Sequence, residues 1–461
     1  MATRTRRLSV HRGICHRTPV RAPAVRISVT TVMVLLQVAW VVVRSGLVAS
    51  VGEPVVLTAI AFSVLAGAIA LALPGARIAA LDRALQRLAT DRRGADGLAV
   101  AAGLALGLAG ATTQQMPSWD EQWMLPAVRL AADEGLRTFF ERYASLPWLG
   151  QQHPPLPVLF YASVMRAFDT GLLGLRIATV LIGTVTLLVV LRIARRLVDP
   201  VTALLSVLAL LASPLFVRME SAAMNDMFVT AFFAGALAFT LRLSDAGAGS
   251  TLEALGLGLC VGAGMVSKYT MALACPVLAV CAWNHGALWR RRREWAIAVA
   301  VAGLVFGAWL LLAARIGAIG GQGAWLERYA GTVTDSGKGL RYALDGLFTK
   351  LPSGLGVWQM PWLVLGAASL ARESVRSARL ISVWVALVCA PLLLTLPDNR
   401  YFLPAYPAFV ILIACGLQRI GTERIRALVL AWLLCGVTLG YYAQVDLGEH
   451  AFLFEAIHQR D

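Results

Sequence analysis

Charged residues are scarce in this chain, and lysine is nearly absent. Only 15% of the 461 residues are charged, against about 25% in a typical soluble domain. Of the 41 basic residues only 3 are lysine, and the acidic residues number 26. Hydrophobic residues make up 58% of the chain, which is more than one buried core can enclose. These proportions exclude an ordinary soluble enzyme, a disordered chain and a fibrous repeat, and they indicate an all-α, polytopic transmembrane protein.

Cysteine is also sparse, and no two cysteines stand in a C-x-x-C pair. Six of the seven lie inside apolar runs, where cysteine behaves as a small hydrophobic residue. The cysteines therefore indicate neither a disulfide framework nor a metal site.

Long apolar runs recur along the whole chain, and each of about 16–24 residues approaches the length that crosses a bilayer. The spacing predicts thirteen transmembrane helices, at 28–50, 55–73, 98–114, 172–192, 201–217, 225–243, 252–267, 269–285, 294–314, 356–371, 380–396, 402–419 and 425–443. A shorter apolar helix at about 155–168 is expected to lie at the membrane interface. The first run reads as a retained signal anchor.

These runs divide the chain into four parts. Residues 1–27 form an arginine-rich cytoplasmic tail, and 28–97 hold two additional spans. Residues 98–419 form the core, and 420–461 hold the last span and a tail.

The arginines indicate how the chain is oriented. With the N-terminus in the cytoplasm, the clusters at 1–27, 77–93, 290–293 and 372–379 all fall on one side, as the positive-inside rule requires. Aromatic residues do not alternate with these arginines, and no motif points to nucleic-acid binding. We therefore expect a multi-pass protein of the cell (inner or plasma) membrane whose basic excess reports orientation.

Two outer segments, 113–171 and 315–354, are too long to be simple connectors. The first contains an amphipathic stretch at 123–135, of the kind that lies flat on a membrane surface. Function is therefore expected on the extracytoplasmic face.

The first outer loop carries two groups of interest. It opens with Asp120 and Glu121, flanked by tryptophans, and it closes with Gln-Gln-His-Pro-Pro-Leu-Pro, which includes His153. An acidic residue here can be a solvated helix cap or a general base for a hydroxyl acceptor. His153 can be a surface histidine or a ligand for an anionic or sugar headgroup.

Other polar residues stand at the outer rims of the apolar spans, where ionisable groups are functional candidates. These residues are Arg176, Asp226, Lys268, Tyr269, Asn399, Arg400 and Tyr401. Snorkelling at a helix end is the alternative for Lys268 and Arg400. Together with the loop carboxylates, the cations suit a phosphate-bearing lipid beside an acid–base pair.

The order of these motifs resembles that of a known family. The Asp-Glu and His-Pro-Pro-Leu motifs are followed by Leu-Arg-Ile at 175–177, Asn-Asp-Met-Phe at 225–228 and Ser-Lys at 267–268. Arg-Tyr-Phe-Leu-Pro follows at 400–404. Over about 95–410 the chain resembles the GT-C membrane glycosyltransferases, in particular the protein O-mannosyltransferase and aminoarabinose (lipid A) transferase branch.

The resemblance implies an inverting glycosyltransferase that uses a polyprenyl-phosphate sugar on the extracytoplasmic face. It implies that Asp120 is the base with Glu121 as its partner, and that Lys268 and Arg400 hold the lipid phosphate. Arg176, Tyr269 and Tyr401 are further candidates for that phosphate site. The aminoarabinose branch has Glu-Lys where this chain has Gln-His at 152–153, so the acceptor (protein, lipid or glycan) and the sugar stay open.

The chemistry is consistent with these residues. A phosphate leaves without protonation once cations neutralise its charge, so one carboxylate suffices. The residues contain no required set of metal ligands, although a divalent metal at Asp120 and Glu121 is an alternative.

A transporter or flippase of envelope lipid or glycan is the main alternative function, and a non-catalytic envelope subunit is another. A transporter would be expected to show sequence repeats and spans broken at the midplane. The second half of this chain does not repeat the first, and its polar residues gather towards one face.

Overall fold

The computed structural model describes residues 75–113, 117, 119–146, 149, 153–245, 250–321, 323, 347, 350–356, 359–394 and 399–418. Within these ranges the regular elements are all helical. The expected tail at 1–27, the spans at 28–50, 55–73 and 425–443, and most of the second outer loop lie outside the described residues.

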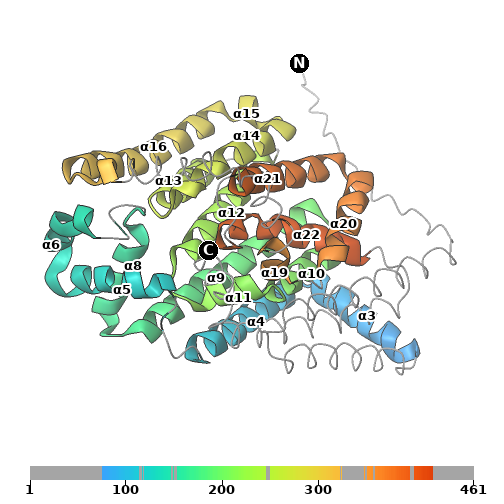
Figure 1. Ribbon diagram of the computed structural model, residues 1–461. Helices are drawn as coiled ribbons and strands as arrows, with labels where there is room; N and C mark the ends of the chain where they lie inside the picture. The colour runs from blue at the N-terminus through green and yellow to red at the C-terminus, as the bar shows by residue number, and fades with distance from the viewer. Residues whose placement is uncertain are drawn as a thin grey trace, which may run out of the picture.

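The first half of the described chain has three parts in order: a pair of helices, the helices of the outer loop, and the central bundle (Figure 1). The first two are α3 (Gly75–Thr90) and α4 (Arg92–Thr113). The outer loop forms α5 (Trp119–Arg129), the π-helical turn η1 (Leu130–Glu134), α6 (Gly135–Arg142), the 3-10 turn η2 (Tyr143–Ser145) and α8 (Leu156–Phe168). The bundle continues with α9 (Leu172–Leu197), α10 (Pro200–Leu211), α11 (Pro214–Ser221) and α12 (Asn225–Ser244).

The second half adds helices on two sides of that bundle. The elements are α13 (Thr251–Met265), η3 (Tyr269–Leu273), α14 (Ala274–Asn284), α15 (Ala287–Arg290), α16 (Arg292–Arg315), α19 (Leu351–Leu355), α20 (Met360–Glu373), α21 (Val375–Leu394), η6 (Asn399–Ala405) and α22 (Tyr406–Gln418). Figure 1 shows α5, α6 and α8 together at one end of the molecule, whereas α20, α21 and α22 lie together on another side.

Five of the described helical segments are long and apolar enough to cross a membrane: α4, α9, α12, α16 and the segment 400–418. The helices at 156–168, 251–265, 269–284 and 362–372 are apolar but shorter. The described part of the chain is therefore all-α and has several helices suited to a membrane, as the composition predicts, and the count of thirteen crossings stays a prediction.

The expected span at 201–217 is broken by a bend. Instead of one straight helix, α10 and α11 form a pair that is bent by 68°. Proline at position 214 has no N–H and its ring clashes with the preceding turn, so the helix cannot continue through it. The bend redirects α11 so that its last residues lead into the start of α12.

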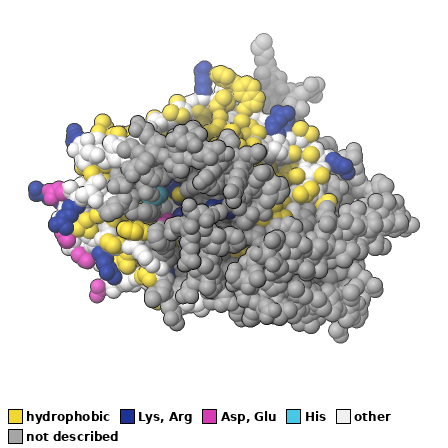
Figure 2. Space-filling view, viewed as in Figure 1, with side chains coloured by type: hydrophobic (Ala, Val, Ile, Leu, Met, Phe, Trp, Pro, Cys, Tyr) yellow, Lys and Arg dark blue, Asp and Glu magenta, His cyan; other side chains and the backbone are white. Residues whose placement is uncertain are grey.

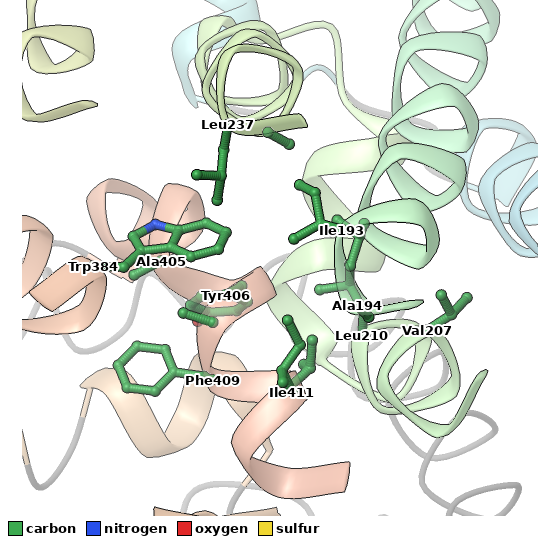
Figure 3. Packing of buried hydrophobic residues seen from close by; sticks show 14 of the residues in the cluster. Ile193, Ala194, Val207, Leu210, Leu237, Trp384, Ala405, Tyr406, Phe409 and Ile411 are labelled. Atoms are coloured by element: carbon green, nitrogen blue, oxygen red, sulfur yellow. The ribbon is translucent and has the colours of Figure 1, made fainter. Parts of the chain in front are cut away.

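A polar core around this bend and an aromatic core beside it hold the bundle together. The side-chain amide of Gln359 donates to the carbonyl oxygen of Ala209 (3.0 Å), near the end of α10. Trp384 stacks on Phe233 with ring centroids 5.7 Å apart, and its indole N–H donates to the carbonyl of Pro404. Figure 3 shows Trp384 among buried side chains of α9, α10, α12 and α22.

The outer loop has a core of its own. Met124, Val128, Phe139 and Tyr143 are buried together with other apolar residues, and the ring of Tyr143 lies 5.4 Å from that of Trp309 in α16. The apolar face of the amphipathic stretch at 123–135 therefore packs on protein. Charged side chains of α6 gather at the exposed end of the molecule (Figure 2). This packing attaches the loop to the bundle and so places the start of α5.

Glycines bring α20 and α22 into direct backbone contact, and we expect this contact to limit stability. A Cβ atom at Gly366 would lie 1.6 Å from the carbonyl oxygen of Leu412. Gly366→Ala should therefore destabilise the protein by about 1–3 kcal/mol or more, because overpacking forces the backbone to shift. The control is Gly303→Ala in α16, where a Cβ meets nothing within 4 Å. Equal melting temperatures for the two variants would contradict the prediction.

Candidate functional site

Asp120 pairs with an arginine from the far end of the chain. Asp120 lies in the first turn of α5, where the positive end of the helix dipole favours a carboxylate. The guanidinium of Arg400, in η6, donates to its Oδ2 and forms an ion pair with it. The two side chains are 13% and 16% exposed, so the pair is largely but not wholly withdrawn from solvent. Residues 280 positions apart thus meet at one point.

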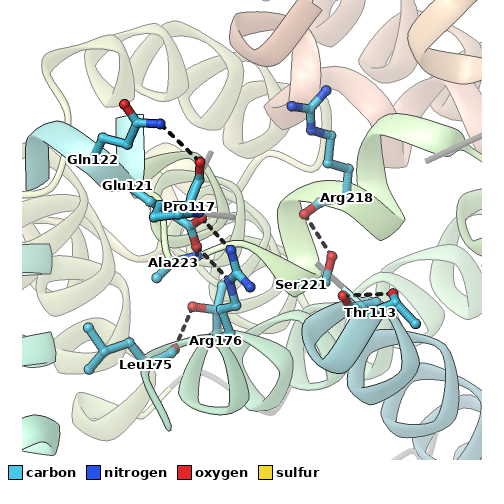
Figure 4. Close-up of polar contacts among 11 residues, drawn as sticks. Thr113, Pro117, Glu121, Gln122, Leu175, Arg176, Arg218, Ser221 and Ala223 are labelled. Carbon is cyan, nitrogen blue, oxygen red and sulfur yellow. Dashed lines mark hydrogen bonds and ion pairs between the residues drawn. The ribbon is translucent and has the colours of Figure 1, made fainter. Parts of the chain in front are cut away.

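Glu121 occupies a different and fully buried environment. Arg176 in α9 donates to both of its carboxylate oxygens, from Nε to Oε1 at 3.0 Å and from Nη2 to Oε2 at 2.8 Å. The backbone N–H of Ala223 donates to Oε1 at 2.7 Å (Figure 4). This bidentate arrangement, with an added backbone donor, is the strong form of an ion pair. Arg176, expected from the sequence to bind substrate, therefore lies where it holds Glu121.

Lys268 forms the third ion pair. It lies in the turn between α13 and η3, and its Nζ is 2.6 Å from Oδ1 of Asp226 in the first turn of α12. The same Nζ lies 4.2 Å from the centroid of the Tyr401 ring, and the Arg400 guanidinium lies 5.9 Å from it. Because an aromatic face attracts cations, Tyr401 connects the Lys268 pair to the Arg400 pair.

His153 joins this group through the end of the outer loop. Its backbone carbonyl accepts from the hydroxyl of Tyr143, and the backbone N–H of Leu156 donates to the carbonyl of Val266 at 3.1 Å. The loop end is thereby attached to the turn that carries Lys268. Burial, then the charge of Lys268 and then that of Arg400, hold the pKa of His153 well below its usual value. The imidazole is therefore neutral at neutral pH and adds no further positive charge beside Lys268 and Arg400.

The remaining expected residues lie at the border of the site. Asn399 begins η6, next to Arg400. The hydroxyl of Tyr269 accepts from the indole N–H of Trp309 at 3.1 Å, so it faces the core of the outer loop. The structure thus brings Asp120, Arg400 and Tyr401 together with the Lys268 pair.

Two contacts of the site escape sequence reasoning. The backbone N–H of Ala223 binds Glu121, and the hydroxyl of Tyr143 binds the loop at His153. A backbone donor has no residue type of its own, and Tyr143 lies outside the motifs and the amphipathic stretch that the sequence singles out. No signal in the sequence could have identified either contact.

The described residues offer no ready-made metal site. Within them, no three His, Cys, Asp or Glu side chains are grouped so as to hold an ion. Both oxygens of Glu121 already accept from Arg176, so the Asp120–Glu121 pair does not present an open set of ligands.

Comparison with known proteins gives one family match. The model of the dolichyl-phosphate-mannose-protein mannosyltransferases matches residues 152–311, a range that includes His153, Arg176, Asp226 and Lys268. No curated protein matches the chain in sequence.

Solved structures extend the likeness beyond that range. The chain is similar to ArnT from Cupriavidus metallidurans in the apo state (19% identity, TM-score 0.52, 70% of this chain and 59% of that chain covered). For the form bound to undecaprenyl phosphate the identity is 20% and the TM-score 0.51, and the match covers 70% of this chain and 60% of that chain. For the Archaeoglobus fulgidus oligosaccharyltransferase in complex with Zn and sulfate the identity is 14% and the TM-score 0.52. That match covers 76% of this chain and 53% of that chain.

The matched region spans less than two thirds of each of these proteins. At such low identity the likeness shows the architecture, and the mannosyltransferase model covers the central part of the same helical core. The chain therefore has the fold of the GT-C membrane glycosyltransferases, which is the resemblance that the order of its motifs predicts.

Proposed function

We propose that this protein transfers a sugar from a polyprenyl-phosphate donor to an acceptor hydroxyl at the extracytoplasmic face, with inversion at the sugar. One observation carries the proposal most strongly: the Asp120–Arg400 ion pair. It puts a carboxylate that can accept a proton directly beside a cation that can hold a phosphate. The name of the matching mannosyltransferase family and the undecaprenyl phosphate bound to ArnT support a lipid phosphate as the ligand.

The charged side chains of the site are already paired with one another before a donor binds. Three carboxylates are balanced by three cations in the pairs Asp120–Arg400, Glu121–Arg176 and Asp226–Lys268. A phosphodiester that enters must compete with Asp120 for Arg400, because a guanidinium binds carboxylate and phosphate by the same planar fork. Binding of the donor phosphate therefore releases the Asp120 carboxylate.

The released carboxylate can then act as the general base. Asp120 accepts the proton of the acceptor hydroxyl, whose oxygen attacks the anomeric carbon on the face opposite the phosphate. The bond between that carbon and the phosphate oxygen breaks, and the oxygen leaves with the electron pair. Arg400 and Lys268 stabilise the negative charge that develops on it, so no second acid is needed.

Arg400→Ala should weaken donor binding much more than acceptor binding. Hydrogen bonds to charged groups contribute about 1.5–3 kcal/mol, which corresponds to a loss of roughly 10- to 100-fold in affinity. The measurement is a titration of undecaprenyl phosphate into the purified protein, together with the apparent KM for the acceptor. The matched control is Arg137→Ala, since Arg137 is 92% exposed on α6. Unchanged phosphate affinity in the Arg400 variant would refute its role.

The activity itself is tested in proteoliposomes. A panel of polyprenyl-phosphate sugars is offered with protein, lipid and glycan acceptors, and the product is identified together with its anomeric configuration. A new glycosidic bond of inverted configuration supports the proposal. Movement of an unchanged lipid-linked sugar across the bilayer, with no new bond, would instead identify a flippase.

A further inference from the structure

Glu220 is a buried carboxyl group that the proposed mechanism does not use. It lies in the last turn of α11, and its exposure is 0%. Its Oε1 lies 3.5 Å from the hydroxyl of Thr184, and its Oε2 is buried without a hydrogen-bond partner. In the described part of the chain no lysine or arginine forms an ion pair with it. Such a group in a helical core calls for an explanation.

A cleft built from glycines receives this side chain. A Cβ atom at Gly183 of α9 would lie 2.4 Å from Cγ of Glu220 and 2.9 Å from its Cδ. A Cβ at Gly107 of α4 would lie 3.3 Å from its Cδ, and one at Gly103 would lie 3.4 Å from Oε1. Where α4 and α9 meet, the absence of three side chains thus leaves the volume that Glu220 fills. The carboxyl is a wedge that joins α11 to both helices.

The residues that follow the wedge reach both sides of the candidate site. Ala223, three positions on, donates its backbone N–H to Glu121, and Figure 4 shows this contact beside Ser221 at the end of α11. Asp226, three positions further, binds Lys268. The short segment from Glu220 to Asp226 therefore connects a fixed point in the helical core to the loop carboxylate Glu121 and to the cation Lys268.

Physical chemistry indicates in which form Glu220 performs this role. An ionised carboxylate without a cation costs several kcal/mol in a buried environment, whereas the neutral acid costs far less. The shape of the side chain and its contact with Thr184, not its negative charge, are then what the cleft requires. Glutamine has nearly the same shape and is always neutral, whereas alanine leaves a void.

We propose that Glu220 is a positioning residue that acts as a neutral acid wedged between α4 and α9. It fixes the turn between α11 and α12, and through Ala223 and Asp226 it places Glu121 and Lys268 for the transfer reaction. Only the last step, the effect on transfer, rests on the proposed function.

The test compares Glu220→Gln, Glu220→Ala and Gly183→Ala in the full-length protein. The control is Gly307→Ala, where a Cβ meets nothing within 4 Å. Hydrogen exchange is measured for peptides that cover 119–124, 222–226 and, as an internal reference, α22. Sugar transfer is measured in parallel.

Glu220→Gln and the control should match the wild type in both measurements. Glu220→Ala and Gly183→Ala should raise exchange at 119–124 and 222–226 but not in α22. Both should lower turnover by roughly 100-fold, the effect of displacing a catalytic group by about 1 Å. A merely structural role would raise exchange throughout the bundle and would not single out these two segments.

Two results would overturn the proposal. One is a Glu220→Gln variant that loses as much turnover and exchange protection as Glu220→Ala does, because the negative charge would then be what matters. The other is wild-type exchange at both segments in Glu220→Ala. If the wild type transferred no sugar from any donor, the proposed function would fail, whereas the exchange comparison would still decide the role of Glu220.

Discussion

Asp120→Asn should abolish sugar transfer while the protein stays folded and inserted in the membrane. A positioned general base contributes about 10²–10⁴-fold to a rate, and asparagine has the shape of aspartate but cannot accept the proton. The substitution also removes the carboxylate that competes with phosphate for Arg400. The variant should therefore bind undecaprenyl phosphate at least as tightly as the wild type does.

This combination of lost turnover and retained donor binding is what identifies a base. Turnover is measured with the donor that the wild type uses, and binding is measured by titration of undecaprenyl phosphate. The matched control is Asp133→Asn, because Asp133 is an exposed carboxylate of the same outer loop, in η1. Retained sugar transfer in Asp120→Asn would contradict the assignment of Asp120 as the general base. Loss of phosphate binding together with transfer would indicate a damaged site instead.

Arg176→Met should cause the largest loss of stability among single substitutions at the site. Arg176 and Glu121 are 3% and 0% exposed, so the substitution leaves a carboxylate buried without its cation. Removing one partner of such a pair costs about 3–5 kcal/mol, whereas replacing both partners by neutral groups can be close to neutral. The double variant Glu121→Gln with Arg176→Met should therefore recover much of the lost stability.

The free energy of unfolding, measured by reversible denaturation in mixed detergent micelles, tests this prediction. Arg137→Met is the control, because Arg137 and Glu141 are 92% and 60% exposed in their ion pair. An exposed ion pair contributes little to stability, so this variant should stay near the wild type. If Arg176→Met were no less stable than Arg137→Met, the buried pair would not be holding α5 on α9.

The candidate residues could be found from the sequence because polar groups are conspicuous in an apolar chain. Lys268 and Asp226 interrupt long hydrophobic stretches, and Asp120 and Glu121 open a loop too long to be a connector. Desolvation makes such residues costly unless they have partners. Their rarity therefore identifies them as candidates, although the sequence does not show which residues they pair with.

The partners themselves depend on tertiary packing. Asp120 and Arg400 are 280 residues apart, and Arg176 could have faced either a phosphate or another side chain. The bidentate pair of Arg176 with Glu121 follows from how α5 packs on α9, and its third contact comes from a backbone N–H at Ala223. Sequence spacing cannot predict contacts between distant elements, because these depend on the packing of every helix that lies between them.

The sequence by itself therefore determined the fold class, the arginine-based prediction of orientation and the set of polar residues to examine. Composition and periodicity are sufficient for these, since burial of apolar surface and desolvation of charge act on residue types. Only the tertiary structure decided that Pro214 bends a span by 68°, that Arg176 serves Glu121 and that Arg400 reaches Asp120. Those outcomes depend on distances, because the energy of an ion pair or hydrogen bond falls steeply with separation.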